Sequence, residues 1–246
     1  MKAIILAAGI GSRIRPLTDN CSKSLLRIGD KTILEMMISH IQDCNINEIV
    51  FVTGYLENQI KEYVKNNNQD LKAYFVTNER YTETNTGFSL LLTKDSVGDS
   101  DFIKFDADVV FDKEILERLL DSPEESALCI DRNIQLDAEE IKVVVDDKNR
   151  ILKANKTIDP KEAIGESIGI EKIGKETAKR LFQELEEMMQ DEKNHQEYYE
   201  AAYERLIEKG ESFHALDITG LDWVEIDTNE DFELARKIFN GRQVST

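Results

Sequence analysis

Histidine and cysteine, on which many catalytic and metal sites depend, are scarce in this sequence, with three of each among 246 residues. Cys21, Cys44 and Cys129 are odd in number and lack the spacing of metal ligands, so they predict free thiols in a reducing cytosol. No Ser/His/Asp or Cys/His arrangement for nucleophilic catalysis is recognisable. His40 falls inside a helical pattern and is expected on the surface of that helix. Any chemistry must then depend on carboxylates, basic side chains and backbone groups.

Positive charge and long apolar runs are also in short supply. Lysine and arginine number 31 against 49 acidic residues, and the net charge of −18 disfavours binding to nucleic acid or to an anionic membrane. No apolar run has membrane-spanning length, and the first one, at 3–6, is too short for a signal peptide. The sequence has no proline-rich linker and no internal repeat. We therefore expect one cytoplasmic domain over 1–246, monomeric or homodimeric, in which any phosphate site is a local positive island.

The N-terminal loop is the candidate for such an island. The apolar run at 3–6 predicts a buried strand, and Gly9 and Gly11 follow it in a loop of small residues. Backbone N–H groups of such a loop approach a ligand closely and bind anions. Arg13 and Lys23 add fixed positive charge, so the loop suits a polyphosphate.

Other interpretations of this loop fit less well. A Rossmann dinucleotide fingerprint requires glycine where the sequence has Ile14, and a Walker loop requires a Gly-Lys-Ser or Gly-Lys-Thr that is absent. A tight structural turn would not demand Arg13, Pro16 and Lys23 together.

Strands and helices alternate in the first half of the chain. Apolar runs predict further strands at 49–54 and 72–77, and apolar residues at helical spacing predict helices at 33–41 and 58–67. This alternation is typical of an α/β fold with one doubly wound, Rossmann-like, mostly parallel mixed sheet and flanking helices. In such sheets the ligand lies beyond the carboxyl ends of the strands.

The second half of the chain does not continue this alternation of strands and helices. Its predicted elements are an antiparallel hairpin at 139–145 and 151–156, a strand at 165–170, a helical stretch at 174–209 that breaks near Asn194, and a closing helix at 231–239.

Two pairs of acidic residues interrupt apolar stretches. The pairs are Asp106 and Asp108 in a predicted strand at 102–111, and Glu225 and Asp227 in a predicted strand at 224–228. Buried carboxylates need a charged partner or a metal ion, and oxygen ligands of this kind suit Mg²⁺. Side chains two apart on a strand point the same way, but only one of Asp106 and Asp108 reaches the ion if the strand ends between them.

A polar run with one glycine, at 83–89, leads into another predicted helix. Asn85 offers both an amide donor and a carbonyl acceptor, and Gly87 would let a ring lie against the backbone, as in a loop that recognises a nucleobase. Simple N-capping by Thr84, Asn85 or Thr86 explains the same run equally well.

The motif LAAGIGSR, with Pro16-Leu17-Thr18 and Lys23 after it, resembles the N-terminal signature of the nucleotidyltransferases that make NDP-sugars and CDP-alcohols. Later motifs resemble the small CTP-using branch of that superfamily, which activates phosphocholine, aminoethylphosphonate, inositol phosphate and related phospho-alcohols. These motifs are Thr84-Asn85 before Ser89-Leu90, Glu140-Ile141-Lys142-Val143, Gly165-Glu166 with Gly169-Ile170, Tyr198-Tyr199-Glu200, and Trp223 before Glu225-Ile226-Asp227-Thr228. The sequence departs from the pattern at Ser22, usually proline, and at Thr86 and Phe88, often Asn and Tyr.

The resemblance implies an enzyme that transfers CMP from CTP to a small phosphorylated or phosphonate acceptor, uses Mg²⁺ and releases pyrophosphate. It implies a nucleotide-binding half at 1–130 and, at 131–246, an acceptor-binding half with a small antiparallel subregion. The family usually has Gly-Asp where this chain has Ala107-Asp108, so the likeness favours Asp108 over Asp106 as a metal ligand.

The likeness also assigns roles to individual residues. Lys23 and Arg13 would be catalytic, and Asp108, Asp227 and Glu225 would hold the metal, with Glu225 either a ligand or a support for one. The nucleotide-binding residues would be Leu6, Ala7, Ala8, Gly9, Gly11, Ser12, Thr84, Asn85, Gly87, Ser89 and Asp106. The acceptor-binding residues would be Lys142, Lys156, Glu166 and Tyr198.

Two alternatives remain at this point. One is a sugar-1-phosphate nucleotidylyltransferase that uses UTP or dTTP. The other is a catalytically inactive, nucleotide-binding regulatory subunit, against which the intact set of Arg13, Lys23, Asp108 and Asp227 argues. The single tryptophan, Trp223, offers no multi-tryptophan cage for a quaternary ammonium acceptor.

Overall fold

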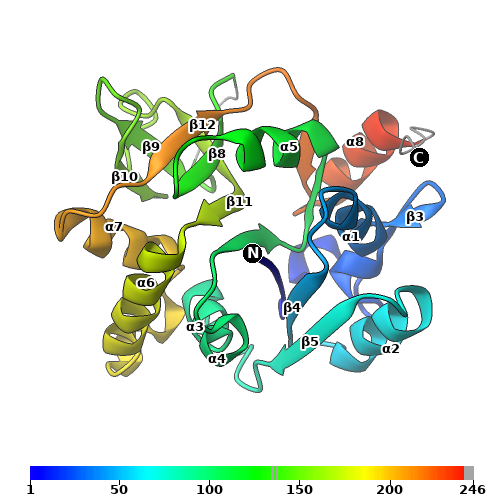
Figure 1. The fold of residues 1–246 in the computed structure, drawn as a ribbon. Coiled ribbons are helices and arrows are strands. Elements are labelled where there is room, and N and C mark those ends of the chain that lie inside the picture. The colour runs from blue at the N-terminus through cyan, green and yellow to red at the C-terminus, as the bar shows by residue number, and fades with distance from the viewer. Residues whose placement is uncertain (134–135, 137, 241–246) are drawn as a thin grey trace.

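The alternating first half predicted from the sequence is present in the structure, a computed structural model that describes residues 1–133, 136 and 138–240 (Figure 1). Its elements are β1 (Lys2–Ala7), β2 (Arg27–Ile28), β3 (Lys31–Thr32), α1 (Ile33–Asp43), β4 (Glu48–Thr53), α2 (Glu57–Asn67), β5 (Lys72–Thr77), α3 (Thr86–Leu91), α4 (Lys94–Val97), β6 (Phe102–Asp106), β7 (Val109–Phe111) and α5 (Lys113–Asp121). Short 3-10 helices, η1 (Ser12–Ile14) and η2 (Lys23–Leu25), shape the N-terminal loop.

The second half contributes antiparallel strands and the longest helix. Its elements are β8 (Ala127–Asp131), β9 (Lys142–Val145), β10 (Ile151–Asn155), β11 (Gly165–Ile173), α6 (Lys175–Met188), η3 (Glu192–Gln196), α7 (Glu200–Glu208), β12 (His214–Asp217), β13 (Trp223–Glu225) and α8 (Asn229–Phe239). The hairpin, the strand that follows it and the broken helical stretch are therefore confirmed. None of the helices in the described residues is both long and apolar enough to cross a membrane.

One mixed sheet joins the two halves. Its strands run in the order β10-β9-β11-β6-β1-β4-β5, and β8, with β12 beside it, also pairs with β11. The pairs β1–β4, β1–β6 and β4–β5 are parallel, whereas β11 is antiparallel to β6, β8 and β9. The register places Leu6 of β1 opposite Asp106 of β6, so the loop that leaves β1 emerges beside the carboxyl end of β6.

The central strands are buried on both faces, as expected of parallel strands between helical layers. Ala3 and Ile5 face a core that includes residues of α1, α2 and α5, and Ile4 and Leu6 face a core that includes residues of α3, α6 and α7. Figure 1 shows the corresponding separation of α1 and α2 from α3, α4 and α6.

The single strand expected at 102–111 is wrong, because the backbone leaves the main sheet after Asp106. Residues 107–108 form a turn, and β7 then pairs with β13 in a separate two-stranded sheet. The strand expected at 224–228 likewise ends at Glu225, so Asp227 lies in the turn before α8. The small sheet, rather than the edge of the main one, brings the two acidic stretches together.

His40 is buried in α1 instead of lying on its surface, with 5% of its area exposed. Its ring packs edge-on against Phe111 of β7, with 5.2 Å between ring centroids. Burial is the main reason that the pKa of His40 falls to about 4, so the ring is neutral at physiological pH and behaves as part of the core.

Candidate active site

Residues from both halves line one cleft of about 860 Å³. It lies beyond the carboxyl ends of β1 and β6, where an open α/β sheet binds its ligands. Of the site residues expected from the sequence, all but Gly87 and Lys142 line this cleft.

The loop after β1 is shaped by Gly11, which has a φ of 66°. The Thr18 hydroxyl donates a hydrogen bond of 2.7 Å to the Gly11 carbonyl, and a Cβ at Gly11 would lie 3.3 Å from Cβ of Lys23. Gly11 therefore allows the loop to fold back over the base of Lys23. At Gly9 a Cβ would meet no described atom within 4 Å, so this part of the loop leaves room for a ligand in the cleft.

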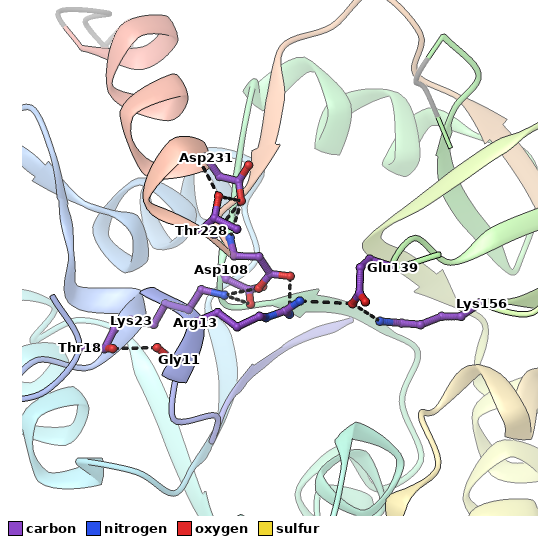
Figure 2. Close-up of polar contacts among 10 residues, drawn as sticks. Gly11, Arg13, Thr18, Lys23, Asp108, Glu139, Lys156, Thr228 and Asp231 are labelled. Atoms are coloured by element: carbon purple, nitrogen blue, oxygen red, sulfur yellow. Dashed lines mark hydrogen bonds and ion pairs between the residues drawn. The ribbon is translucent and has the colours of Figure 1, made fainter. Parts of the chain in front are cut away.

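Lys23 lies at the centre of a charged group at the mouth of this loop (Figure 2). Its Nζ is 2.8 Å from Oδ2 of Asp108 and 2.8 Å from Oδ1 of Asp227. Arg13 approaches the second oxygen of Asp227, with 2.6 Å between Nη2 and Oδ2. Burial alone would lower the pKa of Lys23, but the two carboxylates outweigh it and raise that pKa, so Lys23 is charged.

Asp108, Glu225 and Asp227 form a group whose carboxylate oxygens lie within 4.8 Å of one another. Three hard oxygen donors at this separation fit a divalent cation such as Mg²⁺. Burial, and then repulsion from Asp108 and Asp227, raise the pKa of Glu225 well above its ordinary value. The group thus carries more negative charge than Lys23 alone balances.

The turn before α8 positions Asp227. Thr228 is the N-cap of α8, and its hydroxyl accepts a hydrogen bond from the Asp231 N–H. In return, Oδ2 of Asp231 accepts hydrogen bonds from the backbone N–H groups of Thr228, at 2.7 Å, and of Asp227, at 3.1 Å. The Ile226 N–H donates to the Asp108 carbonyl at 3.0 Å, which ties this turn to the end of β6. Backbone bonds therefore fix both aspartates relative to one another.

The predicted base loop is a tightly bonded cap on α3. Asn85 is the N-cap, with its side chain accepting a bond from the Thr86 N–H, as the capping interpretation expects. The Asn78 side chain donates to the hydroxyls of Thr84 and Ser89, at 3.0 Å each. Thr84, Asn85 and Ser89 also line the cleft, so capping and ligand contact are compatible here.

Gly87 does not offer its backbone to a ring in the cleft. A Cβ there would lie 2.8 Å from the Glu197 carbonyl, to which the Gly87 N–H donates a bond of 3.3 Å. The glycine is needed so that α3 can pack against the segment between η3 and α7. A nucleobase stacked against Gly87 is therefore not supported.

The acceptor side contains three of the four expected residues, Lys156, Glu166 and Tyr198. Nζ of Lys156 lies 5.0 Å from the centre of the Tyr198 ring and 3.7 Å from Glu139, which also contacts Arg13 (Figure 2). Lys142 is 1% exposed and donates to the Glu140 carbonyl at 3.1 Å. Lys142 pairs with Glu166 in the register of β9 and β11 but does not itself line the cleft, so the expected contact with acceptor phosphate is not supported.

A buried polar cluster that the sequence did not reveal lies under the acceptor side. Lys104 Nζ is 2.9 Å from Asp106 and 3.0 Å from Glu171, and it also contacts the Tyr199 hydroxyl. Tyr199 donates a 2.8 Å hydrogen bond to Asp106. Asp106 therefore points to Lys104 and is not in the metal-binding group. The sequence signal that could have revealed this cluster is Lys104, a lysine inside the apolar run of β6.

The comparisons with known proteins agree with this geometry. The family model for nucleotidyl transferases matches residues 2–237. The chain is 31% identical over 256 aligned positions to the CTP:phosphoglutamine cytidylyltransferase of Campylobacter jejuni, covering 95% of this chain and 98% of the relative. It is 43% identical over 115 positions to the choline-phosphate cytidylyltransferase of Haemophilus influenzae, covering 47% of each.

A solved structure has the same fold. The CTP:phosphocholine cytidylyltransferase of Streptococcus pneumoniae superimposes with a TM-score of 0.80 at 23% identity, over 96% of this chain and 98% of that one. The family model spans nearly the whole chain, and the cleft, the cationic loop and the carboxylate group lie within it. The chain belongs to the nucleotidyl transferase family.

Proposed function

We propose that this protein transfers CMP from CTP to a small phosphorylated or phosphonate acceptor and releases pyrophosphate. One observation carries the proposal: Lys23 lies between Asp108 and Asp227, beside an amide-rich loop and inside a cleft large enough for two substrates. The choice of CTP rests on the cytidylyltransferase relatives.

The reaction needs positioning and charge rather than a strong base. An oxygen of the acceptor phosphate bonds to the α-phosphorus, the bond from that phosphorus to the bridging oxygen breaks, and pyrophosphate leaves with the electron pair. The attacking oxygen is already ionised, so no residue has to remove a proton. Lys23 and Arg13 stabilise the charge that accumulates on the α-phosphate and the leaving group.

A divalent cation fits the group formed by Asp108, Asp227 and Glu225, and we assign it as Mg²⁺. When bound it would neutralise charge on the α-phosphate and pyrophosphate. Lys23 pairs with two of these carboxylates and Arg13 with one of them, so part of their negative charge is neutralised before the ion arrives. In this proposal residues 1–130 bind the nucleotide and 131–246 bind the acceptor, in a cytoplasmic monomer or homodimer.

The test is pyrophosphate release with each of CTP, UTP, dTTP, ATP and GTP, against a panel of phospho-alcohols, phosphonates and sugar 1-phosphates. We expect the highest kcat/KM with CTP and a non-sugar acceptor. A higher kcat/KM with UTP or dTTP and a sugar 1-phosphate would replace this proposal with a sugar-nucleotide function. No release with any combination would favour a regulatory subunit.

A further inference from the structure

We propose that Glu200 binds an amino group at the end of the acceptor remote from its phosphate, which makes the preferred acceptor a phosphorylated primary amine. This inference deepens the proposed function and rests on it. It is carried by the burial of Glu200, by the shortage of positive charge around it and by the aromatic residues nearby.

Glu200 is the first residue of α7 and lines the cleft while only 4% of its area is exposed. Its Oε2 is fully buried and has no hydrogen-bond partner among the residues that the structure describes. Ser167 of β11 lines the same cleft, is 5% exposed, and its hydroxyl also lacks a described partner. Buried oxygens of this kind are normally paired, so the cleft holds acceptor capacity that a ligand with N–H donors would use.

The charge balance around Glu200 favours a cation. Lys104 makes its polar contacts with Asp106, Glu171 and Tyr199, and makes none with Glu200. Two buried carboxylates, Glu171 and Glu200, and the partly buried Asp106 therefore have one ammonium group among them. Burial, followed by repulsion from Glu171, raises the pKa of Glu200 to about 8. An incoming ammonium would supply a second positive charge and allow Glu200 to ionise.

The cleft as a whole also has more acidic than basic residues. Eleven acidic residues and three basic ones are among its described lining residues, and two of the basic ones, Arg13 and Lys23, lie at the carboxylate group proposed for the metal. The acceptor side is left with Lys156 for the phosphate and with carboxylates for the remainder of the molecule. An anionic tail would be repelled there, and an apolar one would leave the carboxylates desolvated without a charged partner.

The aromatic residues favour a primary amine over a quaternary ammonium. Quaternary groups donate no hydrogen bond and depend on aromatic faces. Lys104 already lies over the Tyr199 ring, 3.7 Å from its centre, and Lys156 lies over that of Tyr198, at 5.0 Å. Trp223 donates its indole N–H to Asp131 at 2.9 Å. One face of each tyrosine is therefore taken by a lysine.

The experiment compares two acceptors that differ in charge and hardly in shape: 2-aminoethyl phosphate and n-propyl phosphate. We measure pyrophosphate release from CTP and take the ratio of their kcat/KM values, because loss of folded enzyme cancels in the ratio. A charge-assisted hydrogen bond predicts a preference for the amine of roughly 10- to 100-fold. Glu200→Gln should reduce this ratio to about 3-fold or less, mainly through KM for the amine.

Glu197→Gln is the matched control, because Glu197 is three residues away, exposed, and outside the cleft lining. It should keep the wild-type ratio. The inference is overturned if the wild-type enzyme uses n-propyl phosphate or phosphocholine as well as 2-aminoethyl phosphate, or if Glu200→Gln keeps the preference. These outcomes leave CTP-dependent transfer intact, whereas absence of release with every acceptor would refute the proposed function itself.

Discussion

Replacement of Asp227 by asparagine tests the carboxylate group directly. The two oxygens of Asp227 accept bonds from Lys23 at 2.8 Å and from Arg13 at 2.6 Å. Asparagine keeps the size of the side chain but has one oxygen and one NH₂ group. In either orientation one of the two cations then faces a donor instead of an acceptor, and the metal group loses one negative charge.

The expected loss is large for activity and small for stability. Removal of one preorganised electrostatic contact costs about 10²-fold or more in kcat, and a weakened metal site should raise the Mg²⁺ concentration for half-maximal rate by at least about 10-fold. The Asp227 side chain is 26% exposed and Lys23 keeps its bond to Asp108, so the free energy of unfolding should fall by no more than about 1 kcal/mol.

The assay is kcat as a function of Mg²⁺ concentration, with circular dichroism to follow unfolding. Asp99→Asn is a matched control, because Asp99 also bridges two basic residues, Lys175 and Lys179, but outside the cleft. Glu225→Gln should lose as much activity as Asp227→Asn if Glu225 binds the metal, and less if it only supports a ligand. Near-normal activity of Asp227→Asn at low Mg²⁺ would remove Asp227 from the metal site.

Three further predictions concern Lys23, the divalent metal and Gly87. Lys23→Ala should lower kcat by about 10²-fold or more, whereas Lys61→Ala, which breaks a comparable pair with Glu57 outside the cleft, should not; equal kcat values would exclude the role of Lys23. Chelation of divalent metal should abolish turnover and leave the melting temperature nearly unchanged, because Lys23 already pairs with Asp108 and Asp227; unfolding on chelation would contradict this. Gly87→Ala should destabilise the protein by about 1–3 kcal/mol, since its Cβ would lie 2.8 Å from the Glu197 carbonyl; an unchanged denaturant midpoint would show that this packing is loose.

The sequence alone predicted the elements and residues whose local hydrophobic pattern agrees with their burial in the structure. Continuous apolar runs predicted β1 and β4, because strands buried on both faces admit few polar residues. The run at 72–77 also predicted β5, although this edge strand is only partly buried. Carboxylates inside apolar stretches indicated the pairs Asp106/Asp108 and Glu225/Asp227, since such groups need a charged partner. The family likeness favoured Asp108 over Asp106, and the structure places Asp108 beside Glu225 and Asp227.

The features that the sequence did not predict depend on contacts between residues far apart in the chain. The break after Asp106 follows from the pairing of β7 with β13, which the local run does not encode. Gly87 has its neighbour at Glu197, and His40 is buried because Phe111 covers it. The parallel strands β8 and β12 were not predicted at all, since their pairing joins segments on either side of the hairpin and α6. The motif around Lys142 likewise does not show that its side chain is buried and does not line the cleft.

Strand β11 has a consequence for how the two substrates meet. Because it bonds to β8 along one edge and to β9 and then β6 along the other, this strand connects the strand behind the nucleotide loop to the strands behind the acceptor pocket, with a shift of register between Ser167 and Glu171. The relative positions of the two binding regions are then set when the chain folds, so the substrates lose their entropy of orientation when they bind and not in the chemical step. Such an enzyme would work as a fixed template whose loops, rather than domains, adjust to the ligands.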